Sequence, residues 1–284
     1  MQTERVPVAG GVELAVDAWT PASDAGAPYL LVHGLASNAR MWDGVVARLV
    51  ALGHPALTVD LRGHGRSSKP DGPYDVPTVA LDLAGLIDRL ELDRPIVVGQ
   101  SWGGNVVIEL AAEHPDLVGG VAGVDGGWLQ PGRDFPDWDA CRAALAPPHL
   151  AGRRYAEIDS YIRSAHPDWP EAGIQGVLAN FERRPDGTIA PWLTFDRHIA
   201  VLRGLWEHRP AERYSEIEAP VLLMPVDSGD PARTGRKRTD VDDAVRWIPR
   251  ARVRWFQGDH DVHAQHPDHV ADALLNLADR GAAW

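Results

Sequence analysis

The sequence is short of cysteine and of long apolar runs. Its 284 residues include one cysteine, Cys141, which excludes a disulfide within the chain and is typical of proteins from a reducing compartment. No apolar run approaches the roughly 18 residues that a membrane helix needs. Residues 1–17 lack the basic start and the apolar stretch of a signal peptide. We therefore expect a cytoplasmic protein that works away from membranes.

Basic residues are also scarce. The chain has 28 Lys and Arg against 40 Asp and Glu, a formal net charge of -12, which disfavours nucleic acid and anionic membrane surfaces as partners. One basic run contains Arg233, Arg236, Lys237 and Arg238. We interpret it as a solvated loop or the start of a helix, with anion binding as the minor alternative. A small molecule is the expected ligand. The oligomeric state leaves no signature in the sequence.

What the chain does contain is an alternation of strand and helix patterns. The continuous apolar run at 29–32 is typical of a strand buried on both faces of a parallel sheet. Similar runs lie at 55–59, 95–98 and 117–124, and helices with one apolar face are predicted at 42–52, 79–90 and 104–112. This alternation predicts an α/β fold with a mostly parallel twisted sheet and helices on both faces.

The alternation stops after Gly127 and returns at residue 220. Between these points prolines, tryptophans and short helical stretches replace the buried-strand pattern. We therefore expect one α/β core domain, formed by residues 1–127 and 215–284, into which residues 128–214 are inserted as a helical lid. Outside the lid, further strands are predicted at 12–17, 220–224 and 252–256, and helices at 242–247 and 267–278.

A candidate nucleophile lies at the junction of a predicted strand and helix. Residues 99–103 read Gly-Gln-Ser-Trp-Gly and fit the G-x-S-x-G pattern, in which small residues permit a strained turn that exposes the serine. Ser101 would then stand at a helix N-terminus, where the backbone N–H of Trp102 can stabilise an oxyanion. The alternative is a glycine-rich turn with an incidental serine, but the strand–turn–helix context favours the catalytic interpretation.

The loop after the strand at 29–32 is the expected source of a second oxyanion donor. It reads His33-Gly34-Leu35, and the backbone N–H of Leu35 is the candidate. We expect His33 to be a structural hydrogen-bonding residue. The segment 62–67, which contains His64, is interpreted as a rigid turn whose charges connect loops.

The general base must meet Ser101 in space, and His260 is the candidate among twelve histidines. It follows the last predicted strand, on the sheet edge where loops converge. His263 and His266 are expected to pack the loop and cap a helix. A zinc site made of these three histidines would leave the serine motif unexplained, so we expect neither a metal nor another cofactor.

The acid that orients the base stays open among three aspartates. Asp227 and Asp230 follow the predicted strand at 220–224, which agrees with the chain order Ser, Asp, His. Asp125 ends the strand that comes after the nucleophile's helix. We rank Asp227 first, with Asp125 and Asp230 close behind.

These motifs together resemble the α/β-hydrolase superfamily, and specifically its lidded branch of small-molecule enzymes. The resemblance covers nearly the whole chain and rests on His33-Gly34, the segments 60–67 and 99–104, and the histidine loop at 258–267. That branch includes esterases, lactonases, carbon–carbon bond hydrolases, cofactor-free haloperoxidases and epoxide hydrolases. Serine at position 101 departs from the epoxide hydrolases and haloalkane dehalogenases, which use aspartate as the nucleophile. The resemblance specifies the fold far better than the substrate.

The acid's position departs from the family's usual pattern as well. Relatives place it in a Gly-x-x-Asp turn after the penultimate strand, which Asp230 fits only with a one-residue insertion. Asp125 matches the position that some dehalogenase relatives use.

The expected reaction is hydrolysis of a carboxylic ester or lactone through an acyl-enzyme. Two other hypotheses are kept: a cofactor-free lyase, cyclase, perhydrolase or carbon–carbon bond hydrolase that uses the same triad, and a non-catalytic ligand-binding protein on a hydrolase scaffold. The predicted lid is rich in aromatic residues, which indicates a moderately apolar substrate, with about half of them expected to line the pocket and half to pack the lid. These aromatic residues are Trp128, Phe135, Trp138, Trp169, Phe181, Trp192, Phe195 and Trp206.

Overall fold

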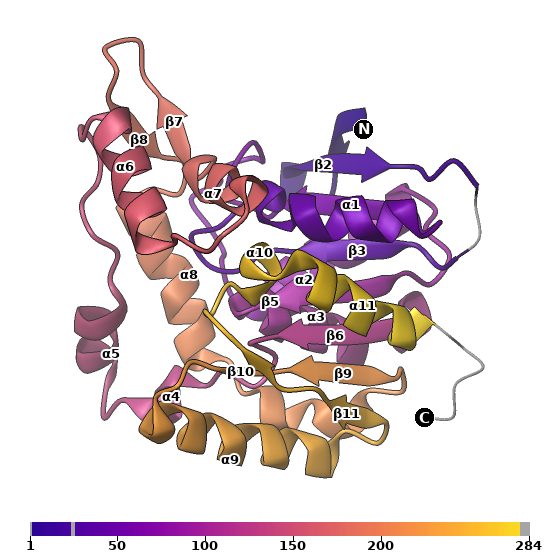
Figure 1. Cartoon of the computed structure of the whole chain (residues 1–284). Helices are drawn as coiled ribbons and strands as arrows, with labels where there is room; N and C mark the ends of the chain where they lie inside the picture. The colour runs from indigo at the N-terminus through magenta and orange to yellow at the C-terminus, as the bar shows by residue number, and fades with distance from the viewer. Residues whose placement is uncertain (1, 24–25, 279–284) are drawn as a thin grey trace.

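The computed structural model describes residues 2–23 and 26–278, and its centre is an eight-stranded sheet (Figure 1). The strands are β1 (Gln2–Pro7), β2 (Glu13–Trp19), β3 (Tyr29–Val32), β4 (Ala56–Asp60), β5 (Ile96–Gln100), β6 (Gly120–Val124), β9 (Val221–Met224) and β11 (Ala251–Val253). They lie in the order β1-β2-β4-β3-β5-β6-β9-β11. The pairings of β2 with β1 and β4 are antiparallel, and all the others are parallel. The predicted α/β fold is confirmed.

Helices cover both faces of this sheet. One face packs against α2 and α3 with part of α9, and the other against α1 and α11. The side chains of β3, β5 and β6 are all buried, which explains why these strands read as continuous apolar runs. The helical segments of the core are η1 (Ala9–Gly11), η2 (Ala39–Trp42), α1 (Asp43–Ala51), α2 (Val76–Arg89), α3 (Trp102–Glu113), η3 (Pro115–Leu117), α9 (Pro231–Trp247), α10 (Val262–Gln265) and α11 (Pro267–Ala278).

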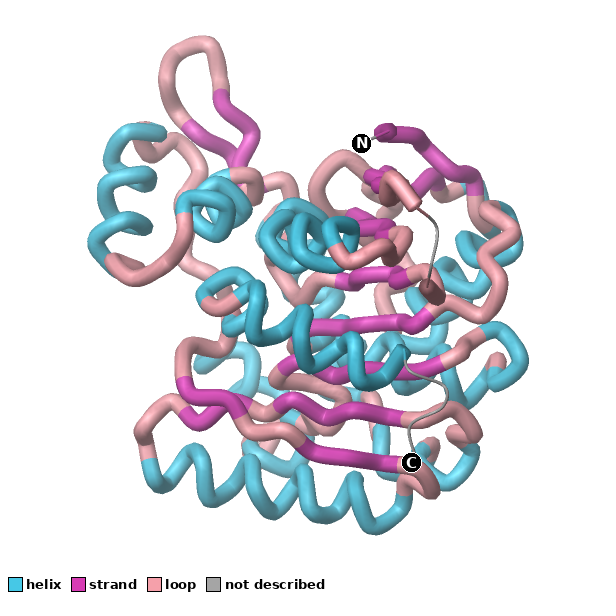
Figure 2. Tube along the Cα trace, turned by 45° about the vertical axis from the view of Figure 1, so that its right-hand side comes forward, coloured by secondary structure: helices cyan, strands magenta, loops and turns pink. Residues whose placement is uncertain are grey.

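The segment 128–214, hereafter the insert, leaves the sheet after β6 and returns before β9. It lies beyond the ends at which β3, β5, β6 and β9 finish, as Figures 1 and 2 show. Part of it has a small apolar centre of its own, in which Ile158, Ile162 and Ile174 pack with Met41 of the core. Its elements are α4 (Pro131–Asp134), α5 (Trp138–Leu145), α6 (Tyr155–Ala165), α7 (Glu171–Leu178), β7 (Phe181–Arg183), β8 (Ile189–Pro191), α8 (Phe195–Glu207) and η4 (Pro210–Glu212), after which η5 (Tyr214–Glu216) leads back to the sheet.

Several elements differ from the sequence predictions. Strand β1 has only Val6 buried, and β7 and β8 have three residues each, so none of them carries the apolar run of a buried strand. The helix predicted at 242–247 is the last part of the 17-residue α9, whose exposed first half lacks apolar periodicity. The strand predicted at 252–256 is divided into β11 and β12 (Phe256–Gln257), and β12 pairs with the two-residue β10 (Val226–Asp227).

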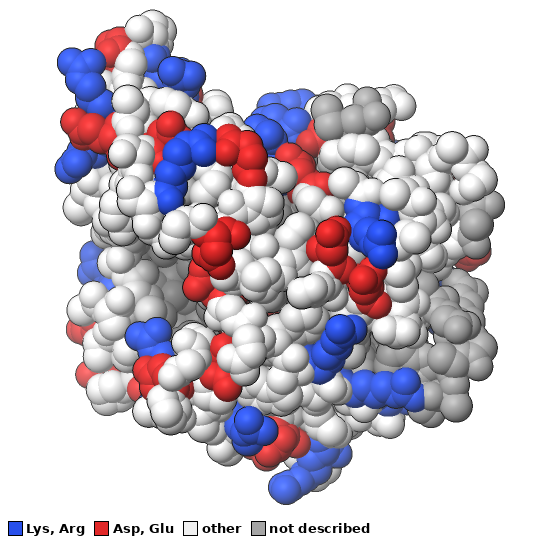
Figure 3. Space-filling model, in the orientation of Figure 1, with Lys and Arg blue, Asp and Glu red and all other residues white. Residues whose placement is uncertain are grey.

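Surface charge is mixed. On the face drawn in Figure 3, acidic and basic side chains are interspersed, and no patch of one sign dominates. Within residues 2–23 and 26–278, no helix is both long and apolar enough to cross a bilayer.

Candidate active site

Ser101 occupies the strained turn between β5 and α3. Its backbone angles are φ 53° and ψ -123°, a region that residues other than glycine rarely adopt. The turn is too tight for larger neighbours: a Cβ on Gly99 would lie 2.1 Å from the carbonyl oxygen of Gly103, and a Cβ on Gly103 would lie 2.3 Å from that of His33. The Ser101 N–H donates to the Val124 carbonyl at 2.9 Å, so β6 holds the turn. The motif read from the sequence has the geometry of a nucleophile elbow.

His260 lies in the loop between β12 and α10, and its ring contacts Asp125. The distance between His260 Nδ1 and Asp125 Oδ2 is 2.6 Å. The backbone carbonyl of His260 accepts a hydrogen bond of 3.3 Å from Nε2 of Gln100, the residue before Ser101. Ser101 and His260 line the same cavity. Three residues from three separate loops are thus brought to one edge of the sheet.

The aspartate that contacts His260 is Asp125, which the sequence analysis ranked behind Asp227. Asp227 accepts hydrogen bonds from the Gly229 N–H at 2.9 Å and from the Thr234 hydroxyl at 2.7 Å. Asp230 caps α9, its carboxylate accepting from the backbone of the helix's first turn. Both carboxylates are therefore occupied by their own turn and helix, and ranking Asp227 first was wrong for the contact with His260.

Burial and ion pairing act in opposite directions on this pair. Burial raises the pKa of Asp125, but the hydrogen bond and charge of His260, together with the charge of Lys237, outweigh it and lower the pKa overall. Loss of water around the His260 ring lowers its pKa, but Asp125 and the nearby Asp261 outweigh that effect and raise it. The two groups therefore stabilise each other's charged forms. In the neutral ring the hydrogen bond to Asp125 keeps the proton on Nδ1, so Nε2 is the nitrogen that can accept a proton.

The loop after β3 carries the two predicted candidates His33 and Leu35. Leu35 lines the cavity with Ser101 and Trp102, and the oxyanion role of the Leu35 and Trp102 N–H groups stays a prediction. His33 is buried, with Nδ1 2.7 Å from the Gly34 carbonyl and Nε2 accepting from the Leu61 N–H at 3.0 Å. Both nitrogens bond to backbone, and burial lowers the ring's pKa. His33 fixes the loop and has no free nitrogen for proton transfer.

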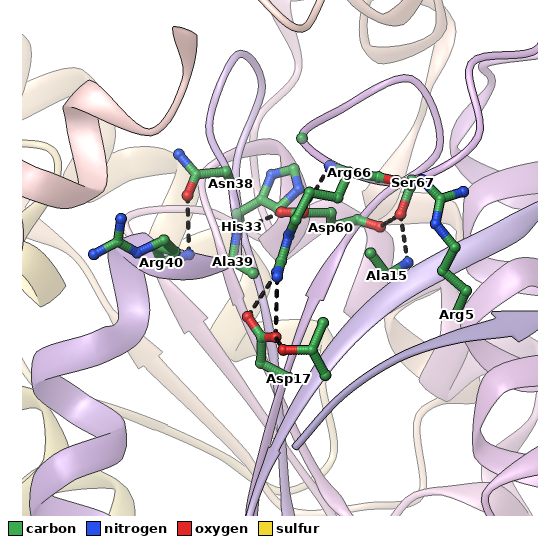
Figure 4. A network of polar contacts seen from close by, with 12 residues as sticks. Arg5, Ala15, Asp17, His33, Asn38, Ala39, Arg40, Asp60, Arg66 and Ser67 are labelled. Atoms are coloured by element: carbon green, nitrogen blue, oxygen red, sulfur yellow. Dashed lines mark hydrogen bonds and ion pairs between the residues drawn. The ribbon is translucent and has the colours of Figure 1, made fainter. Parts of the chain in front are cut away.

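A polar network on the core side holds this loop in place (Figure 4). Asp60, at the end of β4, accepts from the Ala39 N–H at 2.8 Å and from the Arg66 N–H at 2.9 Å. Arg66 also pairs with Asp17 of β2 at 2.6 Å. The predicted role of the segment 62–67 in connecting loops agrees with these contacts.

The cavity at Ser101 has a volume of about 830 Å³ and a mixed lining. Apolar side chains from the insert form one part, and charged side chains form another. The apolar lining includes Trp128, Leu129, Phe135, Leu145, Leu202 and Leu205, and the charged lining includes Arg133, Asp134, Arg233, Arg236, Lys237 and Asp240. Arg233 and Arg236 belong to the run that the sequence analysis interpreted as a solvated loop or helix start. The run lies in the first turns of α9, and its members Arg233, Arg236 and Lys237 line this cavity.

A second, mostly apolar chamber of about 400 Å³ adjoins the first. His198 of α8 lines both chambers, and Ala36 and Ser37 continue the Leu35 loop into the second. His198 is 7% exposed, and its Nε2 has no hydrogen-bond partner among the residues that the structure describes. Five of the eight aromatic residues named in the sequence analysis line one chamber or the other: Trp128, Phe135, Phe181, Trp192 and Phe195.

The insert also braces the loop that carries His260. The indole Nε1 of Trp169 donates to Asp259 at 2.9 Å, and Gln265 donates to Asp168 at 2.6 Å. His263 is fully buried with its ring centroid 4.3 Å from that of Trp42, which agrees with the expected role in packing. The position of His260 therefore depends on contacts from the insert as well as on the sheet.

A family model described as the alpha/beta hydrolase family matches residues 29–273. The chain belongs to the alpha/beta hydrolase family. This alpha/beta hydrolase is 28% identical over 257 residues to a 2-(acetamidomethylene)succinate hydrolase of Mesorhizobium japonicum, an alignment that spans 88% of this chain and 87% of the relative. A crystal structure of E-2-(acetamidomethylene)succinate hydrolase superimposes with a TM-score of 0.78 at 25% identity, covering 97% of this chain and 98% of that one.

A second relative has a different chemistry. Epoxide hydrolase A of Mycobacterium tuberculosis is 32% identical over 193 residues, which is 66% of this alpha/beta hydrolase and 56% of the relative. The relatives are hydrolases of several kinds, so they support hydrolytic activity here.

Proposed function

We propose that this alpha/beta hydrolase is a serine hydrolase that cleaves a carboxylic ester or lactone of a moderately apolar small molecule. The observation that carries the proposal is the 2.6 Å contact between Asp125 Oδ2 and His260 Nδ1. His260 lines the same cavity as Ser101, whose backbone is strained. A paired imidazole beside an exposed hydroxyl is the arrangement that activates a serine.

The proposed reaction runs through an acyl-enzyme. His260 Nε2 takes the proton of the Ser101 hydroxyl while the Ser101 Oγ attacks the substrate carbonyl carbon. The backbone N–H groups of Leu35 and Trp102 stabilise the resulting oxyanion. The intermediate then expels the alcohol, which receives the proton from His260, and a water molecule activated by His260 releases the acid and frees Ser101. Asp125 stays ionised throughout and stabilises the imidazolium.

Replacing the nucleophile tests the mechanism directly. We expect Ser101→Ala to fold as the wild type does and to lose roughly 10³-fold or more of its turnover of nitrophenyl esters. Esters, lactones and diketones should be assayed in parallel. Activity on any of them that survives Ser101→Ala but is lost in His260→Gln would favour the lyase-type alternative, and absence of labelling by a fluorophosphonate probe would favour a non-catalytic binding protein.

The apolar chamber supports a substrate with an apolar arm. We expect kcat/KM for nitrophenyl esters to rise from acetyl to medium-length acyl chains as the arm fills the chamber, by roughly fourfold per buried methylene. Ala190→Trp, which fills the chamber from β8, should abolish the gain for long chains and spare acetate. Ala156→Trp, on the exposed surface of α6, is the matched control. Faster turnover of acetyl esters than of longer ones would contradict this part of the proposal.

The guanidinium groups of Arg133, Arg233 and Arg236 support a substrate that also carries a carboxylate. They line the Ser101 chamber, and arginine is well suited to bind carboxylates. The similar hydrolase from Mesorhizobium has a succinate derivative in its name. A hemisuccinate ester should accordingly have a lower KM than its neutral methyl ester, and the difference should shrink in Arg233→Gln and Arg236→Gln.

A further inference from the structure

Lys237 makes contacts that the sequence analysis did not anticipate. Its Nζ lies 2.6 Å from Asp125 Oδ1 and 2.6 Å from the Val226 carbonyl oxygen, and its side chain is 21% exposed. The same Oδ1 accepts from the Val226 N–H at 2.9 Å. Two donors therefore hold one oxygen of the carboxylate, and the other oxygen faces His260 Nδ1 at 2.6 Å.

The two aspartates that do not reach His260 hold the helix that carries this lysine. Asp230 caps the first turn of α9, and Asp227 accepts from the hydroxyl of Thr234 at 2.7 Å. Thr234 and Lys237 are three residues apart, so they lie on the same face of the helix. The turn after β9 thus supports α9, and α9 in turn presents an ammonium group to Asp125.

Several charged groups around His260 affect the pKa of its ring, and Lys237 is one of them. Asp125 and Asp261 raise the pKa of His260, while Lys237 acts in the opposite direction. His263, on α10, has its pKa lowered to about 3 by burial and is uncharged in the neutral range. Arg233 and Arg236 line the cavity, and Arg233 pairs with Asp230 at 3.6 Å. Among the described residues, Lys237 is the cation whose contact with the Asp125–His260 pair is direct.

We propose that Lys237 is a positioning residue of the active site, which fixes the Asp125 carboxylate in the orientation that meets His260 and opposes protonation of the imidazole by its charge. The role of Lys237, Asp125 and His260 in turnover rests on the proposed function. The contact between Lys237 and Asp125 and the charge of Lys237 do not. Without Lys237, the Oδ1 of this buried carboxylate would keep only the neutral Val226 N–H as a partner. The ammonium group adds a charged donor, which opposes both rotation and protonation of the carboxylate. The enzyme thereby keeps a neutral base at lower pH than the Asp125–His260 pair alone would allow.

The test compares Lys237→Met, which keeps the length of the side chain and removes its charge, with Lys237→Arg, which keeps the charge. The His260 pKa is measured in each protein by NMR titration of the imidazole signals, assigned by their loss in His260→Gln. Arg246→Met, nine residues further along α9 and exposed, removes the same charge about 13 Å away along the helix axis. Thermal melting verifies that each variant is folded.

We expect Lys237→Met to raise the His260 pKa by roughly half a unit to one unit. The acid limb of the pH profile of kcat/KM for nitrophenyl acetate should move upward by the same amount, with roughly tenfold lower kcat at the plateau because Asp125 is held less firmly. Lys237→Arg should restore most of the wild-type pKa, and Arg246→Met should leave it unchanged.

A role in packing alone predicts a different pattern. The rate would then fall equally at every pH, with the His260 pKa unmoved in Lys237→Met and no recovery in Lys237→Arg, and that result would overturn the proposal. If Lys237→Met shifts the pKa but the wild-type protein does not hydrolyse the esters, the proposed function fails while the charge coupling stands. The two failures are therefore distinguishable.

Discussion

The turn after β6 and the turn after β9 lie side by side at the same edge of the sheet, but their aspartates make different contacts. The first carries Asp125 at φ 44°, a strained conformation that turns its carboxylate toward His260. The second carries Asp227 and Asp230, whose carboxylates bind backbone and hydroxyl groups of their own turn and of α9. The residue type is the same in both turns, and the contacts differ because the backbone directs each side chain differently.

The largest expected difference between the turns is in catalytic rate. Asp125→Asn should lower kcat/KM for nitrophenyl esters by roughly 10³–10⁴-fold, because an amide cannot stabilise the imidazolium and favours the wrong tautomer of His260. Asp227→Asn should stay within about twofold of the wild type, since Asp227 does not touch the ring. A comparable loss in both variants would mean that the second turn takes part in catalysis after all.

The pH dependence of the rate sharpens the same comparison. Protonated His260 cannot accept a proton from Ser101, and Asp125 raises the pKa of His260 above its ordinary value of about 6.5. In the wild type, kcat/KM should therefore fall as the pH drops through a midpoint above about 6.5. The residual activity of Asp125→Asn should have its midpoint at lower pH, opposite in direction to the shift expected for Lys237→Met. The midpoint of Asp227→Asn should match the wild type.

The smallest expected effect concerns the helix cap. Asp230→Ala removes the carboxylate that accepts from the first turn of α9, and we expect a drop in melting temperature of roughly 2–4 °C. Activity should change little as long as Lys237 stays in contact with Asp125. Differential scanning calorimetry measures the first quantity, with Asp230→Asn as the conservative control, since asparagine caps helices nearly as well. An unchanged melting temperature in Asp230→Ala would show that the cap contributes nothing.

Local sequence was sufficient for the parts of the site that depend on backbone geometry. Gly99, Ser101 and Gly103 stand at the spacing a strand-to-helix turn requires, because any Cβ at the two glycines would collide with neighbouring backbone. The apolar runs of β3, β5 and β6 likewise follow from burial on both faces of the sheet. Each of these features is encoded within a few consecutive residues.

The tertiary structure alone decided which aspartate contacts His260 and which cation contacts that aspartate. Asp125 and His260 are 135 residues apart, and Lys237 is 112 residues from Asp125. Three aspartates at one sheet edge have equivalent local patterns, and only the φ angle of Asp125 and the packing of α9 distinguish them. A basic run with little apolar periodicity gave no sign that Lys237 would turn inward, because that orientation comes from the contacts of Asp227 and Asp230 with the helix.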